Sequence, residues 1–398
     1  MPSQPAYTAA SLIEKYCGPG VPAFVGRFSN TPETKVVFGP GSVERAGIFA
    51  RNMGARRVLI VTDRGIAEAG HLERVINSLS AAGLEWSAFM GVVENPTTDT
   101  VDACVESARA MGADFLIGLG GGSSMDTAKG CNFLLTNGGQ MKDYWGTGKA
   151  THPMLPLIAI PTTSGTGSEC QSYALISDAL THAKMACGDP KAAARIAILD
   201  PLLTISQPRG VTCVTGIDAI SHAVESTVSR KRSEISVSYS RAAFALLAKA
   251  FPVVCDEPNN EEARAAMQLG AALAGTAIEN SMLGAAHSAA NPLTAHFGTV
   301  HGGAVGMMLP LVVSHNASEA HAAEEYTRLS SSVGAGDLSA FLSSLLEKAG
   351  LPARLPGTVL TPELLPILAK EAAGQWTAQF NPRPVTNEDF EALYRQIA

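Results

Sequence analysis

Two kinds of segment alternate in the first half of the chain. Six short runs rich in apolar and β-branched residues predict strands at 35–39, 56–63, 84–92, 114–120, 155–163 and 194–201. Between the first five, apolar positions recur with helical spacing, as in SVERAGIFARNMG (42–54) and TVDACVESARAMG (100–112). Strand and helix in alternation predict a parallel sheet covered by helices on both faces.

The pattern changes after Pro208. Residues 209–398 contain almost no strand-like run, and their long alanine-rich stretches predict an all-helical domain. The chain therefore divides into an N-terminal extension (1–32), an α/β domain (33–208) and a helical domain (209–398). The fold class predicted is α/β followed by all-α.

Four side chains of the helical domain offer ligands for a metal ion. Asp218 and His222 are four residues apart in a proline-free run, so on a helix they lie one turn apart on the same face. His287 falls in a second predicted helical run (262–291), and His301 follows fourteen residues after His287. Pro292 and Gly298 predict a break in the helix between these two histidines.

One carboxylate and three imidazoles suit a borderline divalent cation such as Fe²⁺, Zn²⁺, Co²⁺ or Mn²⁺. The set contains no thiolate, which argues against a structural zinc site and favours a catalytic one. For the Asp218 and His222 pair alone, an ordinary helix with a solvated or capping carboxylate and a core histidine remains an alternative.

A glycine-rich loop suggests a nucleotide site in the α/β domain. Gly121, Gly122 and Ser123 follow the strand 114–120 and begin the next predicted helix. Successive glycines allow close approach of a phosphate, and a helix N-terminus presents free N–H groups to it. A pyrophosphate is the expected ligand, with a plain strand-to-helix turn as the alternative.

Asp63 and a second loop extend this expectation. The usual G-x-G-x-x-G fingerprint is absent, and Asp63 precedes the glycine loop rather than following it. Asp63, at the end of the strand 56–63, could bind a ribose diol, which favours NAD over NADP because a carboxylate repels a 2′-phosphate. The loop 161–169 (PTTSGTGSE) supplies hydroxyls and amides for a ribose or nicotinamide, although a capped turn alone would look the same.

Composition excludes several classes of protein. The chain has 398 residues, 46% of them hydrophobic and only 16% charged, which describes a well-buried globular protein. The net charge is −7 and no Lys/Arg-rich block stands out, so we expect neither nucleic acid nor a membrane as a partner. Seven scattered cysteines without a C-x-x-C pair suggest reduced thiols and a cytoplasmic location. Neither a signal peptide nor a run of eighteen apolar residues is seen.

Several motifs stand in a specific order along the chain: GGGSSMDTAK, PTTSGTGSE, TGIDAISHAVES, HSAANPLTAHFGTVHG and NPRPVT. Together with FGPGS (38–42) and NPT (95–97), this series resembles the iron-containing (group III) alcohol dehydrogenase family. The resemblance covers about residues 32–398. It implies the dehydroquinate synthase-like fold, with an N-terminal nucleotide domain and a helical domain that binds metal and substrate.

The resemblance also implies roles for individual residues. The catalytic metal, Fe²⁺ or alternatively Zn²⁺, would be held by Asp218, His222, His287 and His301. NAD would be bound by ten residues: Asp63, Asn95, Gly121, Gly122, Ser123, Asp126, Thr162, Thr163, Ser168 and Lys184. The implied activity is hydride transfer between nicotinamide and a small alcohol or carbonyl compound. We expect a homodimer or a higher homo-oligomer.

One position departs from the family. Many members carry a second histidine four residues after the third ligand, proposed to pass a proton, and this chain has Asn291 there. Asparagine does not titrate, so Asn291 cannot carry out that step, and His296 is about half a turn out of phase with His287. The proton could travel through water, threonine hydroxyls or the ribose.

Three related activities remain as alternatives: a glycerol dehydrogenase, a maleylacetate reductase, which typically works without metal, and a dehydroquinate-synthase-like lyase. Four intact ligands argue against the metal-free type, and few basic residues in 209–310 argue against the lyase, which must hold a phosphate substrate. The lining of the substrate pocket cannot be read from one sequence. Five side chains are candidates for it, although each could equally be a core residue: Trp145, His296, Phe297, Trp376 and Phe380.

Overall fold

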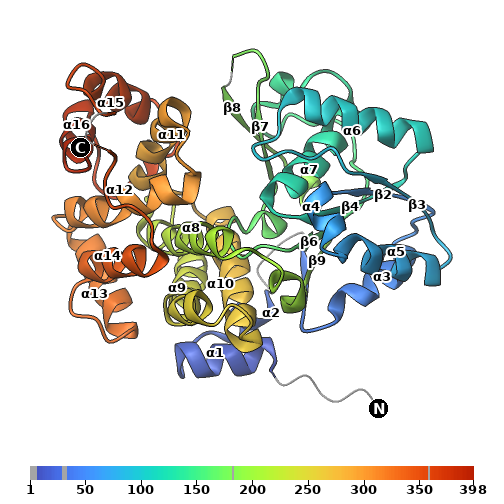
Figure 1. The fold of residues 1–398 in the computed structure, drawn as a ribbon, viewed down its shortest axis with the longest axis horizontal. Helices are drawn as coiled ribbons and strands as arrows, with labels where there is room; N and C mark the ends of the chain where they lie inside the picture. The colour runs from blue at the N-terminus through green and yellow to red at the C-terminus, as the bar shows by residue number, and fades with distance from the viewer. Residues whose placement is uncertain (1–6, 29–33, 182, 357–358) are drawn as a thin grey trace. The chain divides into compact units, whose positions relative to one another are not determined.

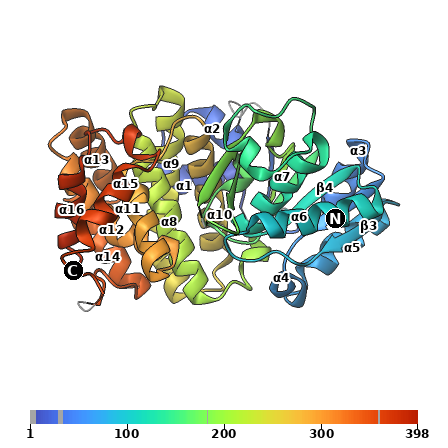
Figure 2. The same cartoon turned by 90° about the horizontal axis from the view of Figure 1, so that it is seen from above.

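The computed structural model describes residues 7–28, 34–181, 183–356 and 359–398. By internal contacts the chain forms two units, and the first contains Met1–Ala9, Arg27–Thr163 and Gly167–Gln207. The second contains Ala10–Gly26, Ser164–Thr166 and Pro208–Ala398. Figures 1 and 2 show the elements of each unit.

The first unit is built on a six-stranded parallel sheet in the order β1-β9-β6-β4-β2-β3. Its strands are β1 (Lys35–Phe38), β2 (Arg57–Val61), β3 (Glu85–Phe89), β4 (Phe115–Gly120), β6 (Leu157–Pro161) and β9 (Ile196–Leu199). Each strand falls within one of the six runs predicted from the sequence. Their apolar, β-branched character follows from burial on both faces, as in parallel sheets generally.

Helices cover both faces of this sheet, and successive strand residues point to opposite sides. Val58 and Ile60 of β2 pack in the cluster that includes helices α3 and α5, whereas Leu59 and Val61 pack against α6 and α7. The helices are α3 (Ala46–Asn52), α4 (Arg64–Glu68), α5 (His71–Ala81), α6 (Thr98–Met111) and α7 (Gly122–Asn137). The predicted two-faced covering of the sheet is confirmed.

A small three-stranded sheet was not predicted. It has the order β5-β8-β7 and consists of β5 (Gly146–Thr147), β7 (Tyr173–Ser177) and β8 (Lys184–Gly188). Its strands are short, and Tyr173–Ser177 alternates between half-buried and buried positions without a long apolar run. A strand pattern of this kind is easily taken for a loop.

The described residues of the second unit form helices joined by loops and include no strand. Its helices are α1 (Ala9–Cys17), α2 (Ala23–Arg27), α8 (Arg209–Val228), α9 (Glu234–Asp256), α10 (Glu261–Glu279), α11 (Ala285–Phe297), α12 (His301–Asn316), α13 (Ala320–Ser332), α14 (Leu338–Ala349), α15 (Leu365–Ala373) and α16 (Asn387–Arg395). Short 3-10 turns complete both units: Ser42–Arg45, Met141–Tyr144, Ser168–Cys170, Pro190–Ala192, Pro201–Thr204 and Ala378–Phe380. Helices α8, α9 and α10 pack against one another.

Part of the N-terminal segment packs on these helices. Lys15 on α1 pairs with Glu262 on α10, and the Lys249 ammonium of α9 donates to the backbone oxygen of Tyr16. Helix α9 is long and apolar enough to cross a membrane, but 67% of its apolar window is buried inside the structure. That burial is typical of a core helix.

One expectation about the segment around His287 was wrong and another is confirmed. The predicted single run 262–291 is two helices, α10 and α11, because the chain turns between Asn280 and Gly284. The predicted break between His287 and His301 is confirmed, and it lies at Gly298, where α11 ends in the left-handed conformation before α12 begins at His301. Pro292 itself lies inside α11. A proline removes one backbone hydrogen bond, and the buried position of Pro292 lets packing offset that loss.

We predict opposite effects on stability for two glycine-to-alanine changes in helices of the second unit. A Cβ at Gly270 on α10 would lie 2.7 Å from Leu247 Cγ on α9, whereas a Cβ at Gly210 on α8 would meet nothing within 4 Å. Overpacking should make Gly270→Ala less stable by about 1–2 kcal/mol despite the better helix propensity of alanine. Gly210→Ala should be neutral or up to about 1 kcal/mol more stable.

Urea unfolding of both variants would measure these effects. A stabilised Gly270→Ala protein would show that α9 and α10 are not held at this close approach.

Candidate metal and nucleotide sites

Helix α8 brings Asp218 and His222 to one side, as their spacing predicted. Both side chains are buried, with side-chain exposures of 8% and 7%, and His222 Nε2 lies 3.5 Å from Asp218 Oδ1. An ionised carboxylate in such a place must be paired with a cation or extensively hydrogen-bonded. Oδ1 of Asp218 nevertheless has no hydrogen-bond donor among the described residues.

Two further histidines converge on the same oxygen. His287, near the start of α11, has its Nε2 3.4 Å from Asp218 Oδ1, and His301, the first residue of α12, has its Nε2 3.8 Å away. The His222 and His287 rings are stacked with centroids 4.9 Å apart, and those of His287 and His301 are 5.4 Å apart. The structure thus brings the ligand atoms of Asp218, His222 and His287 within 4.8 Å of one another. His301 lies outside this group but has its Nε2 near Asp218 Oδ1.

These separations fit a shared metal ion. Two ligands bonded at about 2.1 Å in a tetrahedral arrangement lie about 3.4 Å apart. The three distances to Asp218 Oδ1, between 3.4 and 3.8 Å, are close to that value. Nε2 of His287 also has no hydrogen-bond partner within the described part of the chain, although it is buried. A cation would satisfy both orphaned atoms.

The four ligands differ in exposure. His301 has 28% of its side chain exposed, whereas the other three are almost fully enclosed. A metal held here would be shielded on the side of Asp218, His222 and His287 and accessible beside His301. Catalytic sites keep such an accessible position for a substrate atom, and structural sites do not.

Electrostatics within the cluster agree with this description. Burial alone would raise the pKa of Asp218, but the surrounding imidazoles hold it well below its ordinary value. Burial lowers the pKa of His222. For His287 burial acts in the same direction, but the carboxylates of Glu225 and Asp218 outweigh it and raise the pKa to about 9.

Glu225 is a functional residue that the sequence reasoning missed. It lies on α8, three residues after His222, and its carboxylate is buried, with 4% exposed. One oxygen accepts from His287 Nδ1 at 2.5 Å, and the other accepts from the backbone N–H of Ala286 at 2.7 Å. Glu225 therefore fixes the His287 ring with Nδ1 as the donor, and a metal ion at Nε2 would replace the second proton that the raised pKa of about 9 implies. The i, i+3 spacing in HAVE was the signal that could have suggested it.

Two glycines allow the helices around the cluster to approach closely. A Cβ at Gly284 would lie 3.1 Å from Glu225 Oε1, at the N-terminus of α11. A Cβ at Gly302, next to His301, would lie 2.0 Å from the backbone oxygen of Val214 on α8. Only glycine at position 302 lets α12 lie this close to the helix that carries Asp218.

A hollow in the first unit lies at the carboxyl ends of β2 and β4. In the sheet, β3 lies on one side of β2 and β4 lies on the other. The chain passes from β2 to β3 in one direction and then crosses back over β2 to form β4, so the winding direction reverses between β2 and β4. Ligands of open α/β sheets bind at such a reversal. The hollow has a volume of about 660 Å³ and is lined by the segments 63–66, 90–94 and 162–163 together with Gly121, Ser123 and Ser124.

Five of the predicted nucleotide-binding residues line this hollow: Asp63, Gly121, Ser123, Thr162 and Thr163. Gly122 is the first residue of α7, so the amides of Gly122 and Ser123 lack intrahelical acceptors and are available to an anion, whereas the Ser124 amide donates to the Gly121 oxygen. Asp63 also caps α4, because its Oδ1 accepts from the N–H of Ile66 at 3.0 Å. This capping contact is compatible with the ribose role expected for Asp63, since a carboxylate has further acceptor capacity.

Besides Gly122, four of the predicted nucleotide-binding residues do not line the hollow: Asn95, Asp126, Ser168 and Lys184. Asp126 is buried on α7 and accepts from Ser168 Oγ at 2.8 Å. Lys129, also buried, donates to the backbone oxygen of Ser168 at 2.6 Å. This network ties α7 to the loop 161–169, and burial raises the pKa of Asp126. Lys184 is exposed on β8, and Asn95 is exposed in the left-handed conformation with φ 52°.

The residues suggested for the substrate pocket are spread over different places. Trp145 is 51% exposed in the first unit, and Trp376 is 41% exposed in the second, where it meets Phe380 edge to face. Nε2 of His296 is 2.8 Å from a Glu371 oxygen. Asn291, at the departure from the family pattern, donates to Gln375 Oε1 at 3.1 Å.

Comparison with known families covers nearly the whole chain. Residues 32–201 match the model described as iron-containing alcohol dehydrogenase. Residues 212–398 match the model for the C-terminal part of the Fe-containing alcohol dehydrogenase family.

Individual relatives agree with these matches. The chain is 32% identical to the NAD-dependent methanol dehydrogenase of Bacillus methanolicus over 90% of this chain and 97% of that one. It is 31% identical to the lactaldehyde reductase of Escherichia coli, over 90% and 96%. The crystal structure of sulfoacetaldehyde reductase from Bifidobacterium kashiwanohense in complex with NAD⁺ superposes with a TM-score of 0.85 at 29% identity, covering 92% of this chain and 97% of that one.

Helix approach at Gly302 leads to a prediction about metal content. Gly302→Ala should push α12 from α8 and displace His301, so the purified variant should hold markedly less metal than the unmodified protein. Gly303→Ala is the matched control, because a Cβ there meets nothing within 4 Å. Metal content by atomic spectroscopy measures the difference, and equal content in both variants would contradict the assigned role of Gly302.

The contact between Glu225 and His287 leads to a second prediction. Glu225→Ala should weaken metal affinity by about 10–100-fold, the usual effect of removing the partner of a ligating histidine. Glu225→Gln keeps an oxygen that can accept from His287 Nδ1 and should recover part of the affinity. Competition with a chelator of known affinity measures both, and unchanged affinity in the alanine variant would exclude a positioning role.

Proposed function

The chain belongs to the iron-containing alcohol dehydrogenase family, and on this premise we propose that Asp218, His222, His287 and His301 hold its metal ion. The protein is an NAD-dependent, divalent-metal-dependent oxidoreductase that interconverts alcohols with aldehydes or ketones. Its family membership supports NAD and Fe²⁺ as cofactors. The convergence of three imidazole Nε2 atoms on one carboxylate oxygen, at 3.4–3.8 Å, carries the site assignment.

When bound, the ion supplies Lewis-acid polarisation of the alcohol or carbonyl oxygen. The protein residues determine where that chemistry takes place. Asp218, His222 and His287 enclose the position on one side, and the more exposed His301 leaves the other side accessible to substrate. Glu225 keeps the His287 ring oriented, which pre-organises the ligand set.

We propose that NAD binds the first unit through the hollow at the carboxyl ends of β2 and β4. The α7 amides at Gly122 and Ser123 would hold the pyrophosphate, and Gly121 would leave room for it. Asp63 would bind the adenosine ribose, which disfavours NADP. Thr162 and Thr163 would bind the nicotinamide side, while Asp126 and Ser168 act by fixing the loop that carries these threonines. For Asn95 and Lys184 the proposal rests on the resemblance alone.

A short alcohol or aldehyde is the proposed substrate class. Three relatives that match nine-tenths of the chain are named for methanol, lactaldehyde and 1,3-propanediol, compounds of three carbons or fewer. A fourth, over the same share of the chain, is named for long-chain alcohols, so the test below includes alcohols of both lengths. Proton transfer by the side chain at position 291 is excluded, since asparagine does not titrate. We further propose a cytoplasmic homodimer or higher homo-oligomer.

The function is tested by removing the ion. The metal-depleted protein should lose NAD-linked oxidation of alcohols, assayed with short and long-chain alcohols and followed as NADH absorbance near about 340 nm, and should recover it with Fe²⁺ or Zn²⁺. Asp218→Asn should reduce this activity by at least about a hundredfold and should not be rescued by added metal. Asp256→Asn, at an exposed aspartate paired with Lys348, is the matched control and should retain activity.

Full activity of the metal-free protein or of Asp218→Asn would refute the assignment. Turnover of a substrate without net production of NADH would instead indicate a lyase that returns its NAD unchanged.

A further inference from the structure

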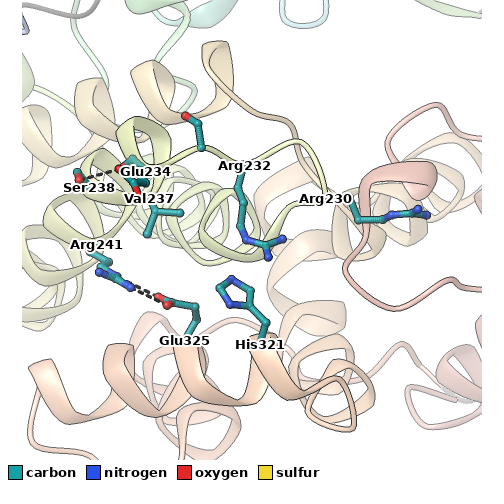
Figure 3. Close-up of a pocket in the computed structure, with 9 residues that line it drawn as sticks. Arg230, Arg232, Glu234, Val237, Ser238, Arg241, His321 and Glu325 are labelled. Atoms are coloured by element: carbon teal, nitrogen blue, oxygen red, sulfur yellow. Dashed lines mark hydrogen bonds and ion pairs between the residues drawn. The ribbon is translucent and has the colours of Figure 1, made fainter.

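A second hollow lies on the helical unit, where the loop between α8 and α9 faces α13 (Figure 3). Its volume is about 470 Å³. Nine residues line it: Arg230, Arg232, Ser233, Glu234, Val237, Ser238, Arg241, His321 and Glu325. None of them belongs to the metal or nucleotide sites, and the resemblance of the sequence assigned them no role.

Part of the charge in this hollow is already neutralised. Arg241 makes a two-pronged contact with Glu325, with Nε to Oε2 at 2.9 Å and Nη2 to Oε1 at 2.6 Å. The Glu325 side chain is only 4% exposed, and Arg328 Nε approaches it at 3.8 Å. Arg241 and Glu325 therefore form a fixed wall with little net charge.

The opposite wall is basic. Arg230 and Arg232 have no carboxylate within ion-pair distance in the described part of the chain, and the guanidinium of Arg232 donates only to the backbone oxygen of Ser229, at 3.2 Å. In Figure 3 the Arg232 guanidinium lies next to the ring of His321. Arg230, Lys231 and Arg232 are consecutive basic residues in a chain with a net charge of −7.

His321 adds an unsatisfied group. Its Nε2 is shielded from solvent and has no hydrogen-bond partner among the residues described. Buried polar atoms of native proteins almost always have a partner, so His321 is short of one in this arrangement. Because Nε2 has no exposed surface, a bound anion would reach it only after the half-buried His321 ring turns toward the hollow. The remaining carboxylate of the lining, Glu234, is exposed in the first turn of α9.

The start of α9 provides additional donors. Ser233 and Ser236 cap this helix reciprocally, which satisfies the amides of those two residues. The N–H groups of Glu234 and Ile235, in the first turn, have no acceptor within the helix. The hollow thus combines guanidinium, imidazole, hydroxyl and amide donors.

We propose that this hollow binds the phosphate group of a small molecule or free inorganic phosphate. Donors from the Arg230–Ser233 loop and from α13 would approach a ligand from different sides, which suits a tetrahedral oxyanion better than a planar carboxylate. Arginine in particular makes directed, charge-assisted bonds to phosphate oxygens. The Arg241 and Glu325 side chains neutralise each other, so Arg230 and Arg232 supply the unpaired positive charge of the lining.

The experiment titrates the intact protein with inorganic phosphate and, separately, with glycerol phosphate, by calorimetry at constant ionic strength. Saturating NAD is present throughout, so that the glycine loop cannot bind the probe. We expect one saturable site for at least one probe. Arg232→Gln and His321→Gln should each weaken it, Arg232→Gln by about tenfold, the usual effect of losing a charge-assisted hydrogen bond.

Lys231→Gln is the matched control, because Lys231 carries the same charge in the same loop but does not line the hollow. Its affinity should stay within about twofold of the unmodified protein, since a screened surface charge contributes little. Thermal melting of each variant reports whether it is folded. Tighter binding of glycerol phosphate would identify a phosphorylated metabolite as the ligand, and binding of inorganic phosphate alone would identify the free ion.

Three results would overturn the proposal. They are the absence of saturable binding for both probes, an equal loss of affinity in Lys231→Gln and Arg232→Gln, and binding that is unchanged in folded Arg232→Gln and His321→Gln proteins.

Discussion

The helical unit depends on the burial of one carboxylate. Asp218 lies inside the protein without a hydrogen-bond donor for Oδ1 among the described residues, and the Nε2 atoms of three histidines lie 3.4–3.8 Å from that oxygen. A buried charge of this kind is costly unless a cation compensates it. Because a cation relieves this desolvation cost, the buried carboxylate favours metal binding at one fixed position that is largely shielded from water.

Close helix packing makes this convergence possible. The ligands come from α8, α11 and α12, and each approach between these helices depends on small residues or on a buried hydrogen bond. Gly302 lets α12 approach the backbone of α8, and Gly284 leaves room for Glu225 at the start of α11. Glu225 then joins α8 to α11 by accepting from both the backbone of Ala286 and the ring of His287. The metal ligands are therefore held by the same contacts that stabilise the fold.

The first unit follows a different principle. The order of the strands determines where a ligand can bind in this unit. At the reversal between β2 and β4, the connections leave these two strands in opposite directions, so a crevice remains at their carboxyl ends. Asp63 and the glycine loop lie at those two ends, so a pattern of strand connections places a carboxylate and free helix amides around one hollow. The hollow around Arg232 and His321 shows that the helical unit contains an additional place with anion-binding chemistry.

Local sequence determined much of this protein. Strands 57–61 and 115–120, helix 98–111 and the shared face of Asp218 and His222 follow from residue periodicity, which depends only on neighbours along the chain. The tertiary structure decided what periodicity cannot express. The turn at 280–284 and the continuation of α11 through Pro292 depend on packing, and the role of Glu225 depends on a ring 62 residues away. Contacts between residues so far apart in the chain are set by how whole helices pack, and for that reason no local pattern predicts them.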